Sequence, residues 1–254
     1  MRFATNGLPD VDYFSTGNFD ICYRASYKSE KLIEFLDNPN CILDNPNYHY
    51  FDLKPARIKD TTTVIAIRDP SPIGTPIVIK RYNKKNTWHA FRRTVQTSRA
   101  ENCWYYAHKL EKLGFSVAPP IAFIQEYLGA GLKGQSWYLT EFVEGLWCLD
   151  YLPRIDNHSS CKEVMGQIVN TLKTLWTHQI THGDLKGSNI LISGDDIVLL
   201  DLDAMKQHRN PVVSRARIDK DVERFLRNWK DRYPVLYQMA KEQLCATGFL
   251  RTHA

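Results

Sequence analysis

An aspartate, a lysine and an asparagine in one short polar segment are the residues of this sequence best suited to do chemistry. Residues 181–189 read THGDLKGSN, and Asp201 follows twelve positions after Asn189. The set suits phosphoryl transfer, because Asp184 could orient or deprotonate an attacking hydroxyl while Asn189 and Asp201 bind Mg²⁺ on the nucleotide phosphates. Lys186 could reach the transferring phosphate and offset its charge. We therefore expect Asp184 and Lys186 to be catalytic and Asn189 and Asp201 to be metal ligands.

The same residue types are common in turns, so His-Gly-Asp alone would not distinguish a catalytic loop from a surface loop. The order of the whole set favours chemistry: D-x-K-x-x-N, then two short apolar runs, then a second aspartate. The apolar runs, residues 189–192 and 197–200, predict a hairpin that turns at residues 193–196. Such a hairpin would return Asp201 to the side of the first aspartate.

A lysine upstream could hold the nucleotide phosphates. Residues 77–80 read IVIK, a predicted strand that ends in Lys80, and Glu101 lies 21 residues further on. Glu101 belongs to a helix predicted over residues 98–113, where apolar residues recur at helical spacing up to Gly114. The kinase type of phosphoryl transfer uses a strand lysine on the nucleotide phosphates and a helical glutamate to hold it. We expect a Lys80–Glu101 ion pair; the alternative is two surface charges on unrelated elements.

Together these features resemble the protein-kinase-like superfamily and, more closely, the Kdo/WaaP lipopolysaccharide kinase family of Gram-negative bacteria. The closer resemblance covers about residues 56–230 and rests on short motifs. The motifs are IK at 58–59 before TTTV at 61–64, IKRY at 79–82, SRA at 98–100, GF at 114–115, PP at 119–120, HGDLK at 182–186 and LDLD at 200–203. The resemblance implies an α+β, two-lobed protein-kinase-like fold, with an N-terminal antiparallel sheet carrying one helix and a mostly helical C-terminal lobe.

The resemblance also implies a reaction and its cofactors. Proteins of this family look like kinases that use ATP and Mg²⁺ to phosphorylate a sugar hydroxyl, of heptose or Kdo, in the lipopolysaccharide inner core. Residues 138–145, YLTEFVEG, look like the linker between kinase lobes, whose backbone at Glu141 and Val143 would hydrogen-bond adenine. As in related kinases, Asp221 would support the catalytic loop by accepting backbone hydrogen bonds. His182 would shape that loop rather than transfer protons.

Two departures separate the sequence from ordinary protein kinases. It has no G-x-G-x-x-G, and the corresponding turn, residues 59–63, would cover the phosphates with threonine hydroxyls and backbone amides. Gly183 stands where H-R-D has arginine, and nothing resembles A-P-E or a phosphorylatable activation segment. Control by activation-loop phosphorylation is therefore not expected.

Two other classes of function stay open. A RIO-like protein kinase or a small-molecule phosphotransferase would share the reaction and take a different acceptor. A pseudokinase or a lipid-binding scaffold would keep the fold without turnover. The intact set argues against the second class: Lys80, Glu101, Asp184, Asn189 and Asp201.

Changes in composition and residue pattern along the chain suggest three parts. Residues 1–52 are polar, with one short helix predicted at 29–36 and no clear match, so we treat them as an N-terminal extension of unknown role. Residues 53–143 are expected to form the N-lobe, and residues 144–254 the C-lobe. Apolar periodicity in the C-lobe predicts helices over residues 164–176 and 221–229.

Composition and charge limit the partners. Apolar residues make up 43% and charged residues 24% of the chain, which excludes a disordered chain, a coiled coil or a collagen-like fibre. The net charge is +5, with seven basic and no acidic residues from Lys80 to Ala100 and four basic residues between Asp203 and Asp219. These runs could bind the lipopolysaccharide inner core or another phosphate-rich glycolipid, or anionic membrane headgroups. A solvated basic face is the alternative. Nucleic acid fits the charge and is not expected.

The cysteines and the first residues bear on the compartment. The six cysteines form no C-x-x-C pair and no zinc-finger spacing, as expected for reduced thiols. Asp10 and Asp12 precede any sustained apolar stretch, so we expect no secretory signal. No window approaches the ~18 apolar residues of a membrane span. We expect a cytoplasmic protein that could contact the cytoplasmic face of the inner membrane.

Overall fold

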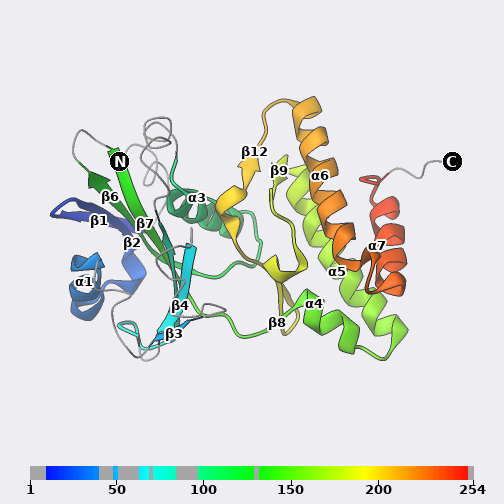
Figure 1. Cartoon of the computed structure of the whole chain (residues 1–254), viewed down its shortest axis with the longest axis horizontal. Coiled ribbons are helices and arrows are strands. Elements are labelled where there is room, and N and C mark those ends of the chain that lie inside the picture. Colours follow the sequence, from blue (N-terminus) through cyan, green and yellow to red (C-terminus); the bar gives the residue numbers. More distant parts are fainter. Residues whose placement is uncertain are drawn as a thin grey trace. The chain divides into compact units, whose positions relative to one another are not determined.

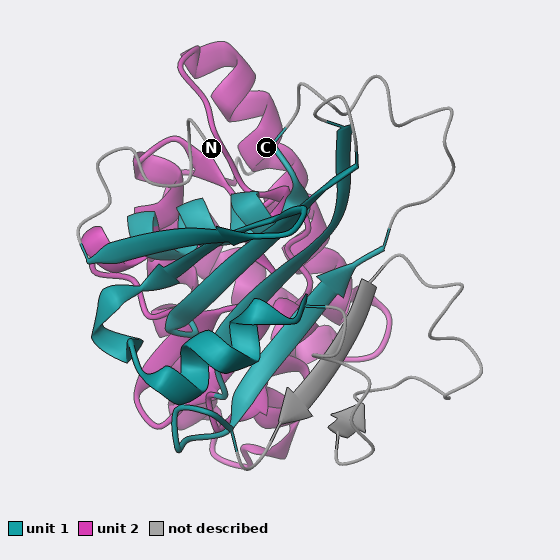
Figure 2. Ribbon diagram, turned by 90° about the vertical axis from the view of Figure 1, so that its left-hand side faces the viewer, with its two compact units in different colours: residues 1–109, 118–142 teal, residues 110–117, 143–254 magenta. Residues whose placement is uncertain are grey.

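In the computed structural model the chain divides into two compact units (Figure 2). The first comprises Met1–Lys109 and Ala118–Phe142, and the second comprises Leu110–Val117 and Val143–Ala254. The structure describes residues 10–39, 48–50, 63–68, 71–83, 97–128 and 132–250.

One antiparallel sheet dominates the described part of the first unit (Figure 1). Its seven strands lie in the order β1-β2-β6-β7-β5-β4-β3, and every neighbouring pair is antiparallel. The strands are β1 (Val11–Thr16), β2 (Phe19–Arg24), β3 (Tyr48–Tyr50), β4 (Thr63–Arg68), β5 (Ile77–Tyr82), β6 (Pro120–Leu128) and β7 (Leu132–Glu141). The order brings β5, which carries Lys80, directly beside β7, with Lys80 opposite Tyr138 in the register.

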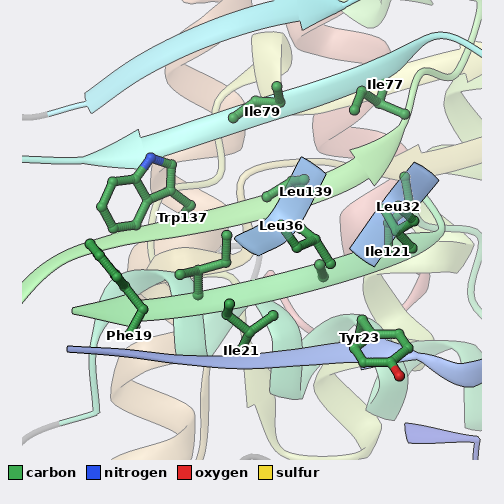
Figure 3. Close-up of a cluster of buried hydrophobic side chains, with 12 residues drawn as sticks. Phe19, Ile21, Tyr23, Leu32, Leu36, Ile77, Ile79, Ile121, Trp137 and Leu139 are labelled. Carbon is green, nitrogen blue, oxygen red and sulfur yellow. The ribbon is translucent and has the colours of Figure 1, made fainter. Parts of the chain in front are cut away.

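Each face of this sheet has its own helix. Helix α1 (Glu30–Asp37) begins at Ser29, whose Oγ accepts a hydrogen bond from the Leu32 N–H at 3.2 Å. Leu32 and Leu36 of α1 are buried in the apolar cluster of the sheet (Figure 3). The strands contribute Phe19, Ile21, Tyr23, Ile77, Ile79, Ile121, Ala122, Ile124, Trp137 and Leu139 to that cluster.

Helix α3 (Arg99–Lys112) contacts the opposite face of the sheet. The Tyr82 hydroxyl of β5 lies 3.3 Å from Cys103 Sγ of α3, and the Arg99 guanidinium lies 4.5 Å from the centre of the Tyr82 ring. Because side chains alternate along a strand, Lys80 shares this face with Tyr82, whereas Ile79 belongs to the opposite face. The helix predicted over residues 98–113 and the strand that ends in Lys80 are confirmed, although β5 continues to Tyr82.

The N-terminal segment is part of the sheet. Sequence analysis set residues 1–52 apart as an extension, but β1 and β2 form a hairpin, and β2 pairs with β6 from Phe19↔Glu126 to Tyr23↔Ala122. Phe19, Ile21 and Tyr23 supply the apolar side chains that hold β2 against the core. A 3₁₀ turn, η1 (Ala25–Tyr27), connects β2 toward α1, whose predicted position at residues 29–36 is confirmed within a residue.

Helices form most of the second unit. They are α4 (Cys148–Tyr151), α5 (His158–Thr177), α6 (Pro211–Lys230) and α7 (Pro234–Ala246), with the 3₁₀ turns η5 (Leu152–Arg154), η6 (Gly187–Asn189) and η7 (Leu202–Ala204). Asn157 caps α5 by accepting hydrogen bonds from the N–H groups of Ser159 and Ser160. The helices predicted over residues 164–176 and 221–229 lie within α5 and α6.

Short strands of the second unit position the polar segment of residues 181–189. They are β8 (Leu146–Trp147), β9 (Ile180–Thr181), β10 (Ile190–Ser193), β11 (Asp196–Leu199) and β12 (Lys206–Gln207). β10 and β11 form the predicted hairpin, with Ile190 opposite Leu199, and β9 pairs with β12. The polar segment therefore runs from one paired strand to the next. Among the described residues, no helix is long and apolar enough to cross a membrane.

Candidate active site

A buried carboxylate on α6 holds the start of the candidate catalytic loop. Asp221 is 1% exposed, and its two oxygens accept hydrogen bonds from the backbone N–H groups of His182 at 2.7 Å and Gly183 at 3.0 Å. Burial raises the pKa of Asp221, and the hydrogen bonds from His182 and Gly183 oppose this shift. The expected support of the loop by Asp221 is confirmed.

Position 183 requires a glycine for two reasons, its backbone conformation and the close approach of Ala204. Its φ is +81°, a conformation that L side chains rarely adopt, and a Cβ atom there would collide with the carbonyl oxygen of Ala204 in η7. These two constraints explain why a glycine stands where H-R-D has arginine. The loop and the segment after Asp201 are packed too closely for any larger residue.

Asp184, Lys186 and Asn189 form one hydrogen-bonded group. Lys186 Nζ lies 2.7 Å from Asp184 Oδ2, and the Asn189 side-chain amide donates to the Asp184 carbonyl oxygen at 2.8 Å. Lys186 N–H also donates to the Asp184 carbonyl at 2.9 Å, and Asn189 N–H to the Lys186 carbonyl at 2.9 Å. The side chains of Asp184 and Lys186 are 32% and 60% exposed, so both are accessible from solvent. The three residues therefore form one hydrogen-bonded turn whose two charged side chains are open to solvent.

Asp201 is placed beside this group by the backbone. Leu200 N–H donates to the Asn189 carbonyl at 2.9 Å, so the residue that follows Leu200 lies next to the turn. His182 is fully buried, and its Nε2 lies 2.9 Å from the Leu200 carbonyl oxygen. Asp201 has φ +56°, the left-handed conformation, which costs a non-glycine residue about 1–2 kcal/mol. Such strain is typical of functional sites, and the burial of His182 fits its expected role in shaping the loop.

A cysteine that sequence analysis did not single out also supports the loop. Cys148, at the start of α4, is fully buried, and its Sγ lies 3.1 Å from the Gly187 carbonyl oxygen. A Cβ atom at Gly187 would collide with the Leu149 side chain, so α4 packs directly on this glycine. Burial raises the pKa of the Cys148 thiol, which keeps it protonated as a donor. No motif in the sequence pointed to this contact, since the two residues are 39 positions apart.

Glu101 lies in the first turn of α3, in the first unit, and is 8% exposed. Its Oε2 accepts hydrogen bonds from Lys133 Nζ of β7 at 2.9 Å and from the Ser98 N–H at 3.3 Å. The structure thus places Lys133 on the carboxylate that was expected to bind Lys80. Lys80 lies on the sheet face that α3 contacts, and its ion pair with Glu101 stays a prediction. The contact with Lys133 was missed because it joins a helix to a strand 32 residues away.

The predicted adenine-binding segment includes the end of β7. Glu141 N–H donates to the Pro119 carbonyl at 3.0 Å, so an adenine contact at this residue would use its carbonyl oxygen. The Glu141 carboxylate accepts a hydrogen bond of 2.7 Å from the Tyr27 hydroxyl of η1. The chain enters the second unit at Val143, the other residue expected to contact adenine. Tyr27 therefore links the N-terminal segment to this predicted linker, a contact that sequence analysis missed.

Some expectations fall outside the described residues. They concern the phosphate-covering turn at residues 59–62 and the basic residues Lys84, Lys85, Arg92 and Arg93. Within the described part of the chain, no group of three or more His, Cys, Asp or Glu residues is arranged to hold a metal ion. Magnesium in nucleotide sites needs fewer protein ligands, because phosphates and waters complete its coordination. The pair Asn189 and Asp201 is consistent with that requirement.

Comparisons with known proteins agree with this geometry. A family model described as the protein kinase domain matches residues 119–220, the segment that carries Asp184, Asn189 and Asp201. Among solved structures, the chain resembles WaaP in complex with acyl carrier protein, with a TM-score of 0.55 and 13% sequence identity. The alignment covers 80% of this chain and 78% of that chain. At this identity the likeness shows the fold, and the expected α+β protein-kinase-like fold is confirmed.

Proposed function

We propose that this protein is an ATP-dependent kinase that transfers the γ-phosphate to a sugar hydroxyl, of heptose or Kdo, in the lipopolysaccharide inner core. One observation supports the assignment to phosphotransfer: Asp184, Lys186 and Asn189 form a hydrogen-bonded turn, and Asp201 lies beside it. The matching kinase domain model and the kinase-like fold support the same reaction class.

Asp184 is the residue proposed to align the acceptor. Its carboxylate is partly exposed and held in place by Lys186, so a sugar hydroxyl could donate a hydrogen bond to it. As the hydroxyl oxygen bonds to the γ-phosphorus, the bond from phosphorus to the β,γ-bridging oxygen breaks and the hydroxyl proton passes to Asp184. Lys186 Nζ lies 2.7 Å from that carboxylate, where it would offset negative charge on the transferring group.

Asn189 and Asp201 fit a magnesium ion by their chemistry. The Asn189 Nδ2 group donates to the Asp184 carbonyl, which leaves Oδ1 as the atom of this amide that could bind a cation. Asp201 adds a carboxylate two residues after β11, next to Leu200, whose N–H donates to the Asn189 carbonyl. When bound, Mg²⁺ neutralises charge on the nucleotide phosphates. Lys80, braced by Glu101, would hold those phosphates, and the backbone of Glu141 and Val143 would bind adenine.

The sugar acceptor is inferred separately from the reaction class. It is supported by the short motifs shared with the Kdo/WaaP family, and the similarity of fold to WaaP agrees with it. Such an acceptor is an amphiphile with anionic groups, which fits the basic run of the second unit, Lys206 to Arg217. The proposal places the protein at the cytoplasmic face of the inner membrane, where ATP and the growing inner core would meet.

A panel of acceptors tests the proposal. Purified protein would be incubated with MgATP labelled in the γ-phosphate and, in separate reactions, dephosphorylated inner-core lipopolysaccharide, free heptose and Kdo, an aminoglycoside and a generic protein substrate. We expect label only in the inner core, at a sugar hydroxyl that mass spectrometry can map. Preferential labelling of the protein or of the aminoglycoside would replace the sugar acceptor with the corresponding alternative. MgATP binding without transfer to any acceptor would favour a pseudokinase.

A further inference from the structure

The amino-terminal end of α6 exposes two adjacent apolar side chains. Val212 is 78% exposed and Val213 is 48% exposed, both in the first turn. Asn210 caps this turn by accepting hydrogen bonds from the N–H groups of Val212 and Val213 at 2.9 and 3.2 Å. The cap fixes the backbone of the turn, so the two valines project from an ordered element rather than from a loose loop.

Basic residues flank these valines along the chain. Lys206, Arg209, Arg217 and Lys220 are all exposed. Residues 204–220 hold five basic residues and one acidic residue, Asp219, a net charge of +4. Asp219 pairs with Arg215 at 2.9 Å, so the only acidic side chain of this stretch is already used. Along α6, Val213, Arg217 and Lys220 are spaced at i, i+4 and i+7 and therefore lie on one stripe.

Helix stability does not account for this charge. The amino-terminal end of a helix carries a partial positive charge, so acidic residues are favoured there and basic residues are not. α6 has no acidic residue in its first turn. At the other end, Arg227 and Lys230 lie in the last turn, where positive charge is favourable. The dipole of α6 therefore does not explain the basic residues near Val212.

We propose that the amino-terminal end of α6 docks on an anionic phospholipid surface. Val212 and Val213 would enter the boundary between headgroups and acyl chains, while the flanking basic residues contact lipid phosphates. Figure 1 shows this end of α6, in light orange, extending past the neighbouring ends of α5 and α7. The four exposed cations suit a diffuse anionic surface, which needs no fixed geometry of partner groups. This inference stands on exposure and charge and does not require kinase activity.

Helix α6 connects Val212 and Val213 to the candidate catalytic loop. Asp221 lies ten residues after Pro211 on α6, which is ~15 Å along a helix that rises 1.5 Å per residue. The same Asp221 holds the backbone of His182 and Gly183. Docking would therefore set the distance between Asp184 and the lipid surface. This consequence, unlike docking itself, rests on the proposed function.

Vesicle flotation of the purified full chain tests the docking. The probes are phosphatidylcholine vesicles with and without about 30% phosphatidylglycerol, at about 0.05 M and about 0.5 M salt. We expect binding only to the anionic vesicles, and its loss at high salt. Arg209→Glu with Arg217→Glu should weaken binding about 25-fold or more, since each of the two positive charges is worth about fivefold. Val212→Ser with Val213→Ser should weaken binding to the anionic vesicles severalfold at the lower salt concentration.

The chain offers matched control variants. Val235 is 64% exposed in the first turn of α7, and Lys241 is exposed further along that helix. Val235→Ser with Lys241→Glu should leave vesicle binding unchanged, and circular dichroism would verify that all variants fold. Failure to bind anionic vesicles, or equal binding by the α6 and control variants, would overturn the proposal. Binding of an acidic protein in place of vesicles would also overturn it.

Kinase assays separate this inference from the proposed function. Inner-core acceptor dissolved in detergent should be phosphorylated equally by the native chain and by Val212→Ser with Val213→Ser, whereas acceptor embedded in anionic vesicles should lose labelling in that variant. If the protein transferred no phosphate in either form but still bound vesicles through α6, docking would stand and the proposed function would fall.

Discussion

Asp221 Oδ2 on α6 lies 2.7 Å from the backbone nitrogen of His182, 39 residues earlier in the chain. The same carboxylate binds the N–H of Gly183, so one buried side chain fixes the entrance to the loop that carries Asp184. This relationship makes the candidate catalytic loop depend on α6.

Replacing Asp221 should damage both stability and activity. Asp221→Ala leaves the N–H groups of His182 and Gly183 without this acceptor, at about 1–3 kcal/mol each, so we expect the free energy of unfolding to fall by about 2–6 kcal/mol. Urea denaturation would measure it. Asp231→Ala, at the exposed carboxyl-terminal cap of α6, is the matched control and should cost under about 1 kcal/mol. Equal losses for the two variants would contradict the anchoring role.

Two glycines with positive φ allow the cost of backbone strain to be measured apart from the cost of a steric collision. Gly183 (φ +81°) would place a Cβ atom against the Ala204 carbonyl, whereas Gly194 (φ +57°) has open space around it. Gly194→Ala should cost about 1–2 kcal/mol of stability from strain alone and keep activity. Gly183→Ala should cost more and reduce phosphate transfer, because the loop must move. Urea denaturation and turnover measured side by side would refute this account if the two variants behaved alike.

Lys80 and Lys133 should have separable effects. Lys80→Met should lower kcat/KM for MgATP by about 100-fold or more if Lys80 holds the nucleotide phosphates. Lys133→Met leaves the nearly buried Glu101 without this cation, so we expect a loss of about 1–3 kcal/mol in stability and a smaller kinetic effect. Lys112→Met, at the exposed end of α3, is the control. A large kinetic loss for Lys133→Met and none for Lys80→Met would show that Lys133, and not Lys80, holds the nucleotide phosphates.

His108 on α3 predicts a loss of stability in acid. Burial, together with the nearby Arg24, lowers the pKa of His108 from 6.5 to about 4. As pH falls below about 6.5, the unfolded chain takes up a proton that the folded chain still excludes, so this contribution is complete above pH 6.5 and is lost toward pH 4. Up to about 3 kcal/mol depends on it.

The pH dependence can be assigned to His108 by substitution. Urea denaturation at several pH values between about 4 and 7 would record the slope in the native chain and in His108→Gln, which cannot titrate there. We expect a shallower slope in the variant. An unchanged slope would assign the acid sensitivity to other groups.

Local sequence patterns predicted the helices, strands and turns whose residues recur at regular spacing. Helical spacing ending at Gly114 gave α3, and the order of Asp184, Asn189 and Asp201 around two apolar runs gave the turn and the hairpin. These features depend on neighbours within about twenty residues, where periodicity and turn chemistry are informative.

Contacts between residues far apart in the chain could not be predicted from such local patterns. The pairing of β2 with β6 joins residues about a hundred positions apart, and the polar composition of the first strand, with exposed Tyr13, concealed a sheet edge. The hydrogen bonds from Lys133 to Glu101 and from Tyr27 to Glu141 form only because the fold brings their elements together. Such contacts follow from tertiary packing, which residue spacing does not encode.

The most direct test of the central claim is transfer of the γ-phosphate from MgATP to dephosphorylated inner-core lipopolysaccharide by Asp184→Asn. Asp195→Asn is its control, because Asp195 is an exposed aspartate in the turn between β10 and β11. The account predicts label in the lipid with the native chain and with Asp195→Asn, and a loss of about 100-fold or more with Asp184→Asn at unchanged MgATP affinity. Full transfer by Asp184→Asn, or none by the native chain with bound MgATP, would contradict it.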